Sequence, residues 1–155
     1  MAVISSLMKT DMVTVKPDDL VSDAADLMSK NHVGAVLVVE GGDLAGILSE
    51  RDVVERVVAT GKDPAATRVS DVATMDVVAV ESGTHVRKCA EMLLAMGVRH
   101  LPIVENGAPV GILSSRDFLA YVVEGLERVI DKIGYEEALG EGQDPYDHLG
   151  GSYGK

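Results

Sequence analysis

Two short clusters of serine, arginine and aspartate contain the side chains that could bind a phosphorylated sugar. The first cluster, Ser49, Arg51 and Asp52, lies in the stretch GILSERD. A hydroxyl and a guanidinium beside the free N–H groups of a helix start can bind phosphate, and a carboxylate can accept hydrogen bonds from a sugar diol. The stretch GILSSRD repeats this chemistry 65 positions later, in Ser114, Arg116 and Asp117.

Each cluster also fits a capping box, in which the Ser side chain accepts a backbone hydrogen bond and the Asp three residues later reaches back. Capping leaves the arginines unexplained. Arg51 and Arg116 would each place a cation at the positive end of the helix dipole, at a cost of up to about 1 kcal/mol. We therefore favour a ligand site over capping alone, provided that the guanidinium groups lie beside a hollow and not in open solvent.

The two clusters belong to an internal duplication. Residues 4–58 align with residues 69–123 without a gap, and about a third of the positions are identical. In each half the hydrophobic pattern predicts the order β-α-β-β-α, with one parallel crossover and one hairpin. Strands are expected at 12–15, 35–40 and 44–48 in the first half and at 77–80, 100–105 and 109–113 in the second.

A helical apolar stripe follows the first strand of each half. Its members are Val21, Ala24, Ala25 and Met28, repeated as Val86, Cys89, Ala90 and Leu93. This spacing makes Cys89 a packed core residue and not a nucleophile. We assign residues 1–60 to the first repeat, 61–68 to a linker and 69–125 to the second repeat.

An extra apolar stripe continues past the second repeat. Spacings of three and four run through Leu119, Val122, Leu126, Val129 and Ile133, which predicts a helix to about Ile133. We therefore interpret residues 126–155 as a helical extension followed by a poorly ordered, acidic, Gly-rich tail that begins at Gly134. The alternative is a tail that docks a partner or a sister subunit through Tyr146 or Tyr153.

The amino-acid composition disfavours several classes of partner and function. The net charge of −11 disfavours nucleic acids and anionic membranes as partners, and no apolar run is long enough to span a bilayer. A single cysteine and the lack of a recognisable signal peptide predict a soluble, cytoplasmic protein. The four histidines lack metal-ligand spacing. Paired carboxylates such as Glu136 and Glu137 lack a rigid frame, so an enzyme is disfavoured.

The repeated order of elements, the run Leu101, Pro102 and Ile103, and the Gly-apolar-apolar-Ser-x-x-Asp junctions resemble a tandem pair of cystathionine-beta-synthase (CBS) domains. The resemblance covers roughly residues 1–125. It implies an α+β fold, often called a Bateman module, in which two repeats related by a pseudo-twofold axis pack through their sheets. Adenosine-containing ligands would bind in the two clefts between the repeats.

The resemblance also assigns residues to the ligand. Asp52 and Asp117 would hold ribose hydroxyls, and the phosphates would face Ser49, Arg51, Ser114 and Arg116. The adenine side of the Asp117 cleft would consist of Met8, Val13, Val33 and Gly34. That of the Asp52 cleft would consist of Ala73, Val78, Val98 and Arg99. Ile47 and Ile112 would lie beside the Asp of their own repeat, and we expect further phosphate contacts from Arg99 and His100.

Differences between the halves predict unequal clefts. Gly34 aligns with Arg99, so the second repeat alone has a basic side chain at this position near the phosphates. Met8 likewise aligns with Ala73, and Leu37 aligns with Pro102. We therefore expect the two clefts to bind ligand with different affinities.

The resemblance to a CBS pair implies a regulatory, non-catalytic function. A stand-alone module would bind AMP, ADP, ATP, S-adenosylmethionine or an NAD-type ligand, without a required cofactor or metal, and a partner protein would respond to the resulting shift in packing. Homodimers are common in the family, and the stripe at 119–133 is free to support one. The alternative is a structural or interaction protein with vestigial clefts, acting through dimerisation and its tail.

Overall fold

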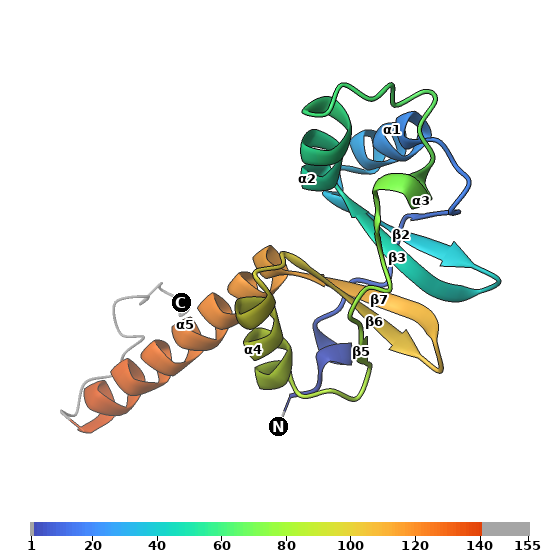
Figure 1. Ribbon diagram of the computed structural model, residues 1–155. Coiled ribbons are helices and arrows are strands. Elements are labelled where there is room, and N and C mark those ends of the chain that lie inside the picture. Colours follow the sequence, from blue (N-terminus) through green and yellow to red (C-terminus); the bar gives the residue numbers. More distant parts are fainter. Residues whose placement is uncertain (1, 141–155) are drawn as a thin grey trace, which may run out of the picture. The chain divides into compact units, whose positions relative to one another are not determined.

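The chain folds into an α+β architecture built on two sheets (Figure 1). The structure is a computed structural model and describes residues 2–140. These residues form two compact units, the first ending at Asp117 and the second beginning at Phe118. Both repeats contribute to the first unit, and the second unit consists of the rest of the last helix.

The first repeat has the predicted order of elements. After a 3-10 turn, η1 (Ile4–Ser6), strand β1 (Thr14–Val15) precedes helix α1 (Val21–Asn31). The hairpin of β2 (Ala35–Glu40) and β3 (Asp43–Ser49) leads into the second helix, which begins as α2 (Glu50–Val53) and continues as a π-helical turn, η2 (Val54–Val58). Strand β2 pairs parallel with β1 and antiparallel with β3, which confirms the predicted crossover and hairpin.

The second repeat follows the same plan. A short helix, α3 (Val69–Val72), is followed by strands β4 (Thr74–Met75) and β5 (Val80–Glu81) and by helix α4 (Val86–Met96). Strands β6 (His100–Glu105) and β7 (Ala108–Ser114) form the second hairpin, and helix α5 spans Ser115–Gly140. The first strand of each repeat is shorter than predicted, and β5 begins where the predicted strand at 77–80 was expected to end.

The first segment of each repeat pairs with the other repeat. Strand β4 runs antiparallel to β3 and completes a four-stranded sheet of order β1-β2-β3-β4. At the N-terminus, Lys9 and Ile112 exchange backbone hydrogen bonds of 2.9 and 3.0 Å beside the sheet β5-β6-β7. The sequence pattern predicted neither pairing, because such short segments show no hydrophobic period.

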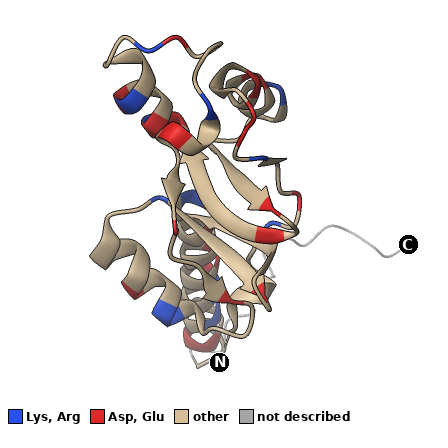
Figure 2. Ribbon diagram, turned by 45° about the vertical axis from the view of Figure 1, so that its right-hand side comes forward, with Lys and Arg blue, Asp and Glu red and all other residues tan. Residues whose placement is uncertain are grey.

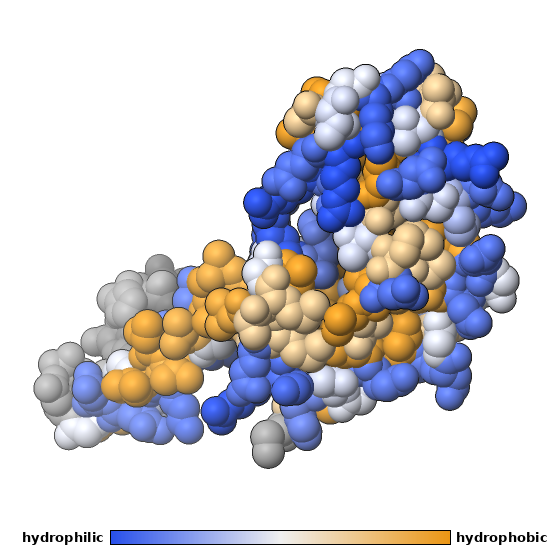
Figure 3. Space-filling model, in the orientation of Figure 1, coloured by the Kyte–Doolittle hydropathy of each residue, from blue (hydrophilic) through white to orange (hydrophobic). Residues whose placement is uncertain are grey.

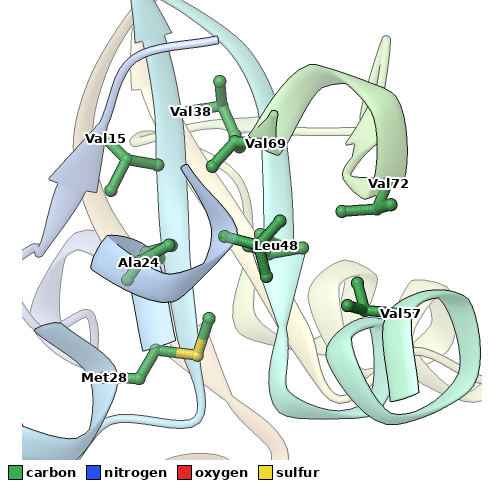
Figure 4. Packing of buried hydrophobic residues seen from close by; sticks show 10 residues of the cluster. Val15, Ala24, Met28, Val38, Leu48, Val57, Val69 and Val72 are labelled. Carbon is green, nitrogen blue, oxygen red and sulfur yellow. The ribbon is translucent and has the colours of Figure 1, made fainter. Parts of the chain in front are cut away.

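Strand β2 is buried on both faces and joins two parts of the core. Val36 and Val38 belong to a cluster between the first sheet and its helices. Ala35 and Leu37 point to the other face, where they pack with Ile112 of the second repeat. The predicted packing of the repeats through their sheets is therefore confirmed. Figure 4 shows the helix-side cluster, with Val15, Ala24, Met28, Val38, Leu48, Val57, Val69 and Val72 converging.

Cys89 occupies the core-facing stripe of α4, as predicted. Its side chain is fully buried, and burial raises the pKa of its thiol. Because the thiolate is the reactive form of cysteine, this environment favours an inert packing role.

Helix α5 is longer than the sequence indicated. Residues 134–140 are helical, so their assignment to a poorly ordered tail was wrong. A single Gly134 costs a helix only about 1 kcal/mol relative to alanine, and an ion pair of 3.8 Å between Lys132 and Glu136 spans it. The rest of the tail, with Tyr146 and Tyr153, lies outside the described residues.

The apolar stripe of α5 is exposed within the described chain. Figure 3 shows apolar side chains along this helix, and the exposed members are Leu119, Val122, Val123, Leu126, Val129, Ile130 and Ile133. None of the helices within residues 2–140 is long and apolar enough to cross a membrane.

Candidate ligand site between the two repeats

The two serine clusters form matching helix starts. Ser49 N–H donates to Asp52 Oδ2 at 2.9 Å, and Asp52 N–H donates to Ser49 Oγ at 3.2 Å. At the second junction the equivalent distances are 3.1 Å to Asp117 and 3.2 Å to Ser114. Both predicted capping boxes are confirmed. In each box the Asp accepts through Oδ2 alone, so its Oδ1 atom is outside the box.

A cavity of about 290 Å³ lies beside Asp117 and is lined by both repeats. Nine of the residues predicted from the sequence line it: Val13, Val33, Gly34, Arg99, His100, Ile112, Ser114, Arg116 and Asp117. Polar residues that the prediction did not name also line it, including Lys9, Asp11 and Glu50. Its volume is near the lower end of the range for small-molecule pockets.

A second cavity, of about 360 Å³, lies beside Asp52. The predicted residues that line it are Ile47, Ser49, Arg51, Asp52, Val78, Val98, Arg99 and His100. Glu55, Arg56 and Asp76 line it as well, and the prediction had named none of them. Both arginines of the repeated motif, Arg51 and Arg116, therefore border a hollow.

Two residues predicted for the adenine side do not line either cavity within residues 2–140. The side chain of Met8 lies over Gly111, where a Cβ atom would come within 2.6 Å of its sulfur. Ala73 packs against the helix-side core of the first repeat. The physical reason is that both residues belong to the short segments exchanged between the repeats, so packing against a strand determines where their side chains point.

A cation is bonded to each candidate ribose-binding carboxylate. Lys9 Nζ lies 2.9 Å from Asp117 Oδ1, and Arg56 Nη2 lies 3.3 Å from Asp52 Oδ1. Neither cation was predicted from the sequence. The repeat alignment contains a signal for the first, because Lys9 aligns with the uncharged Thr74.

These contacts determine the charge of Asp117. Burial alone would raise the pKa of this carboxyl, but hydrogen bonds from Ser114 and Lys9 outweigh burial and hold the pKa below its ordinary value. The side chain of Asp117 is only 16% exposed. It is therefore a partly buried carboxylate that stays ionised at neutral pH, the form that accepts hydrogen bonds from a diol.

Arg51 differs from Arg116 in its protein contacts. Arg51 Nε donates to Glu55 Oε1 at 2.7 Å. An arginine at a helix start led us to expect a bound anion beside it, and in the first repeat the Glu55 carboxylate supplies part of that negative charge. The guanidinium group of Arg116 forms no hydrogen bond or ion pair with any residue in the described range 2–140. Only in the second repeat, therefore, is the arginine at the helix start without an anion from the described part of the chain.

His100 lies between the cavities and lines both. Burial and, to a smaller extent, the charge of Arg99 lower the pKa of His100, and they outweigh the opposite effects of Glu50, Asp117 and Asp52. The imidazole is therefore neutral at pH 7.

This lowered pKa predicts a loss of stability in acid. Below about pH 6.5, the ordinary pKa of histidine, the unfolded chain binds a proton that folded His100 does not, so the free energy of unfolding falls as the pH is lowered. We expect the wild type to lose more stability than His100→Gln between about pH 7.5 and 5.5 in urea unfolding experiments. Parallel pH profiles for the two proteins would contradict this assignment.

Acidic and basic residues are interspersed along the helices (Figure 2). Within residues 2–140, the structure does not bring three or more His, Cys, Asp or Glu side chains into a group that could hold a metal ion.

Comparison with known proteins identifies the family. The CBS domain model matches residues 4–59 and 69–124, and the chain belongs to the CBS domain family as a tandem CBS pair, a regulatory module. The CBS domain-containing protein YhcV of Bacillus subtilis (strain 168) is 34% identical over 117 residues, covering 76% of this chain and 83% of YhcV.

Solved structures agree with this assignment. The CBS-domain containing protein ATU1752 from Agrobacterium tumefaciens superposes with a TM-score of 0.71 and 31% identity, over 77% of this chain and 98% of that chain. The structure of CBSX2 in complex with AMP has a TM-score of 0.69 at 22% identity, over 80% of this chain and 98% of that chain. At this identity the second likeness concerns the fold alone.

Proposed function

We propose that this chain senses an adenosine-containing nucleotide, such as AMP, ADP or ATP, in the two cavities between its repeats. The single observation that carries the proposal is the composition of the cavity walls. Each cavity contains one Ser-x-Arg-Asp helix start together with apolar residues, and residues of the other repeat complete the wall.

The chemistry of the walls fits the parts of a nucleotide. The Oδ1 atoms of Asp52 and Asp117 accept from one cation each, and a carboxylate oxygen has further lone pairs that can accept from ribose hydroxyls. Arginine side chains suit phosphate because their N–H groups can bind it in a bidentate way. Apolar side chains such as Val13 in one cavity and Val78 in the other suit a base. That CBSX2 binds AMP on the same fold supports this proposal.

Ligand binding would shift the equilibrium between different packing arrangements of the two repeats. The ligand would not be chemically changed. A ligand held by residues of both repeats favours the arrangement in which the two walls have the correct spacing. An effector protein that contacts both repeats could then respond to occupancy.

Thermal unfolding of the whole chain with AMP, ADP, ATP, S-adenosylmethionine and NAD tests the proposal. A ligand at about a hundred times its dissociation constant stabilises the folded state by about 2.7 kcal/mol, a rise in Tm of about 5 to 10 °C for a chain of this size. The double variant Asp52→Ala/Asp117→Ala should show a much smaller rise. Unchanged melting with every compound would instead favour an interaction protein with vestigial clefts.

We also propose that the chain forms a homodimer through the exposed stripe of α5. Equivalent helical positions of the two repeats both expose apolar side chains, at Val54 and Val58 in the first and at Leu119 and Val123 in the second. A second copy of the chain offers a surface of the same pattern, as an isologous interface requires. Light scattering that gave twice the mass of one chain would support the dimer, and the mass of one chain would contradict it.

A further inference from the structure

The structure places the two repeated arginines in different electrostatic surroundings. Arg51 and Glu55 form an ion pair across one helical turn, and Glu55 itself lines the Asp52 cavity. The pairing lowers the pKa of Glu55 and raises that of Arg51, so both groups are charged at neutral pH. The position equivalent to Glu55 in the second repeat is Ala120, which offers no carboxylate to Arg116.

The remaining cations reinforce this difference. In the Asp52 cavity, Arg56 donates to Val72 O at 2.8 Å and pairs with Asp52, so both arginines of this helix already have protein acceptors. In the Asp117 cavity, the guanidinium group of Arg116 makes no hydrogen bond or ion pair with the described part of the chain. Arg99 lines both cavities and therefore does not distinguish them. Arg116 is therefore free to bind an anion in the Asp117 cavity.

We propose that Glu55 is a specificity-determining residue that competes with ligand phosphate for Arg51, which makes the Asp117 cavity the phosphate-selective site of the pair. This inference rests on the proposed nucleotide function. A phosphate entering the Asp52 cavity must displace the Glu55 carboxylate from Arg51 and then remain close to that negative charge. A phosphate entering the Asp117 cavity meets neither obstacle at Arg116.

A reciprocal exchange of the two residues tests the inference. Glu55→Ala is made in an Asp117→Ala background, in which the Asp52 cavity is the site measured, and Ala120→Glu is made in an Asp52→Ala background. Both positions are exposed and helical, and alanine and glutamate are both good helix formers, so the fold should tolerate the exchange.

Isothermal titration with AMP and with adenosine provides the measurement. Glu55→Ala should tighten AMP binding to the Asp52 cavity by about two- to fivefold, and Ala120→Glu should weaken AMP binding to the Asp117 cavity by a similar factor. Adenosine affinity should stay the same in both, because it has no phosphate. As a matched control, Glu91→Ala removes an equivalent pair with Arg87 on α4 and should leave AMP affinity unchanged.

The outcomes separate this inference from the proposed function. An AMP dissociation constant that stays the same after Glu55→Ala would overturn the role of Glu55 and leave nucleotide binding intact. A gain for adenosine as large as that for AMP would also overturn it, since the effect would then not depend on phosphate. A chain that binds neither compound would overturn the proposed function and this inference together.

Discussion

AMP binding in the Asp117 cavity is expected to weaken about ten- to a hundredfold when Asp117 is replaced with alanine. A hydrogen bond from a ribose hydroxyl to an ionised carboxylate contributes about 1.5 to 3 kcal/mol, and each 1.4 kcal/mol is about tenfold in the dissociation constant. The contacts that keep Asp117 ionised, from Lys9 and Ser114, maintain the stronger form of the acceptor. Calorimetric titration of the whole chain measures the change.

The same substitution removes half of a capping box, which should separately lower the free energy of unfolding by about 1 kcal/mol. Asp117→Asn distinguishes the two effects, because it keeps a side-chain acceptor of the same size but lacks the charge. We expect its affinity to lie between those of the wild type and Asp117→Ala. An unchanged AMP constant in Asp117→Ala would rule out the ribose assignment without affecting the fold.

Gly46→Ala is expected to lower the free energy of unfolding by about 3 kcal/mol, the upper end of the usual cost of overpacking. A Cβ atom at Gly46 would lie 2.6 Å from the backbone oxygen of Thr74 and 2.9 Å from the sulfur of Met75. Both neighbours belong to β4, whose pairing with β3 fixes the backbone. The carbonyl group therefore cannot move without breaking the edge of the sheet.

Gly111→Ala is the matched control, because Gly111 occupies the equivalent position in the second repeat. A Cβ atom there would meet the side chain of Met8, with the sulfur at 2.6 Å. The sulfur and Cγ of this flexible side chain can rotate away, which leaves the Met8 Cβ at 3.0 Å, so we expect a smaller loss of about 1 kcal/mol. Urea unfolding of both variants compares them directly, and a larger loss for Gly111→Ala than for Gly46→Ala would show that this account of the two contacts is wrong.

Much of the candidate site could be predicted from the duplicated motif. Both capping boxes follow from the three-residue spacing of Ser and Asp, and most residues assigned by resemblance, such as Val13 and Ile112, line the expected cavity. The pair of Arg51 with Glu55 was also within reach, because a spacing of four on a helix brings opposite charges together. The contact between Lys9 and Asp117 could not be predicted from the sequence, because no local pattern relates residues so far apart in the chain.

The sequence by itself determined the order of elements, the core-facing stripes of α1 and α4, and the starts of both second helices. These features depend on side-chain periodicity and on contacts within a few residues, which are visible in the linear chain. Only the tertiary structure decided which segments pair across the repeats, that Met8 and Ala73 lie away from the cavities, and which cation meets each aspartate. The physical reason is that the two halves share one hydrophobic pattern, so the choice between pairing within a repeat and pairing across repeats is made by packing in three dimensions.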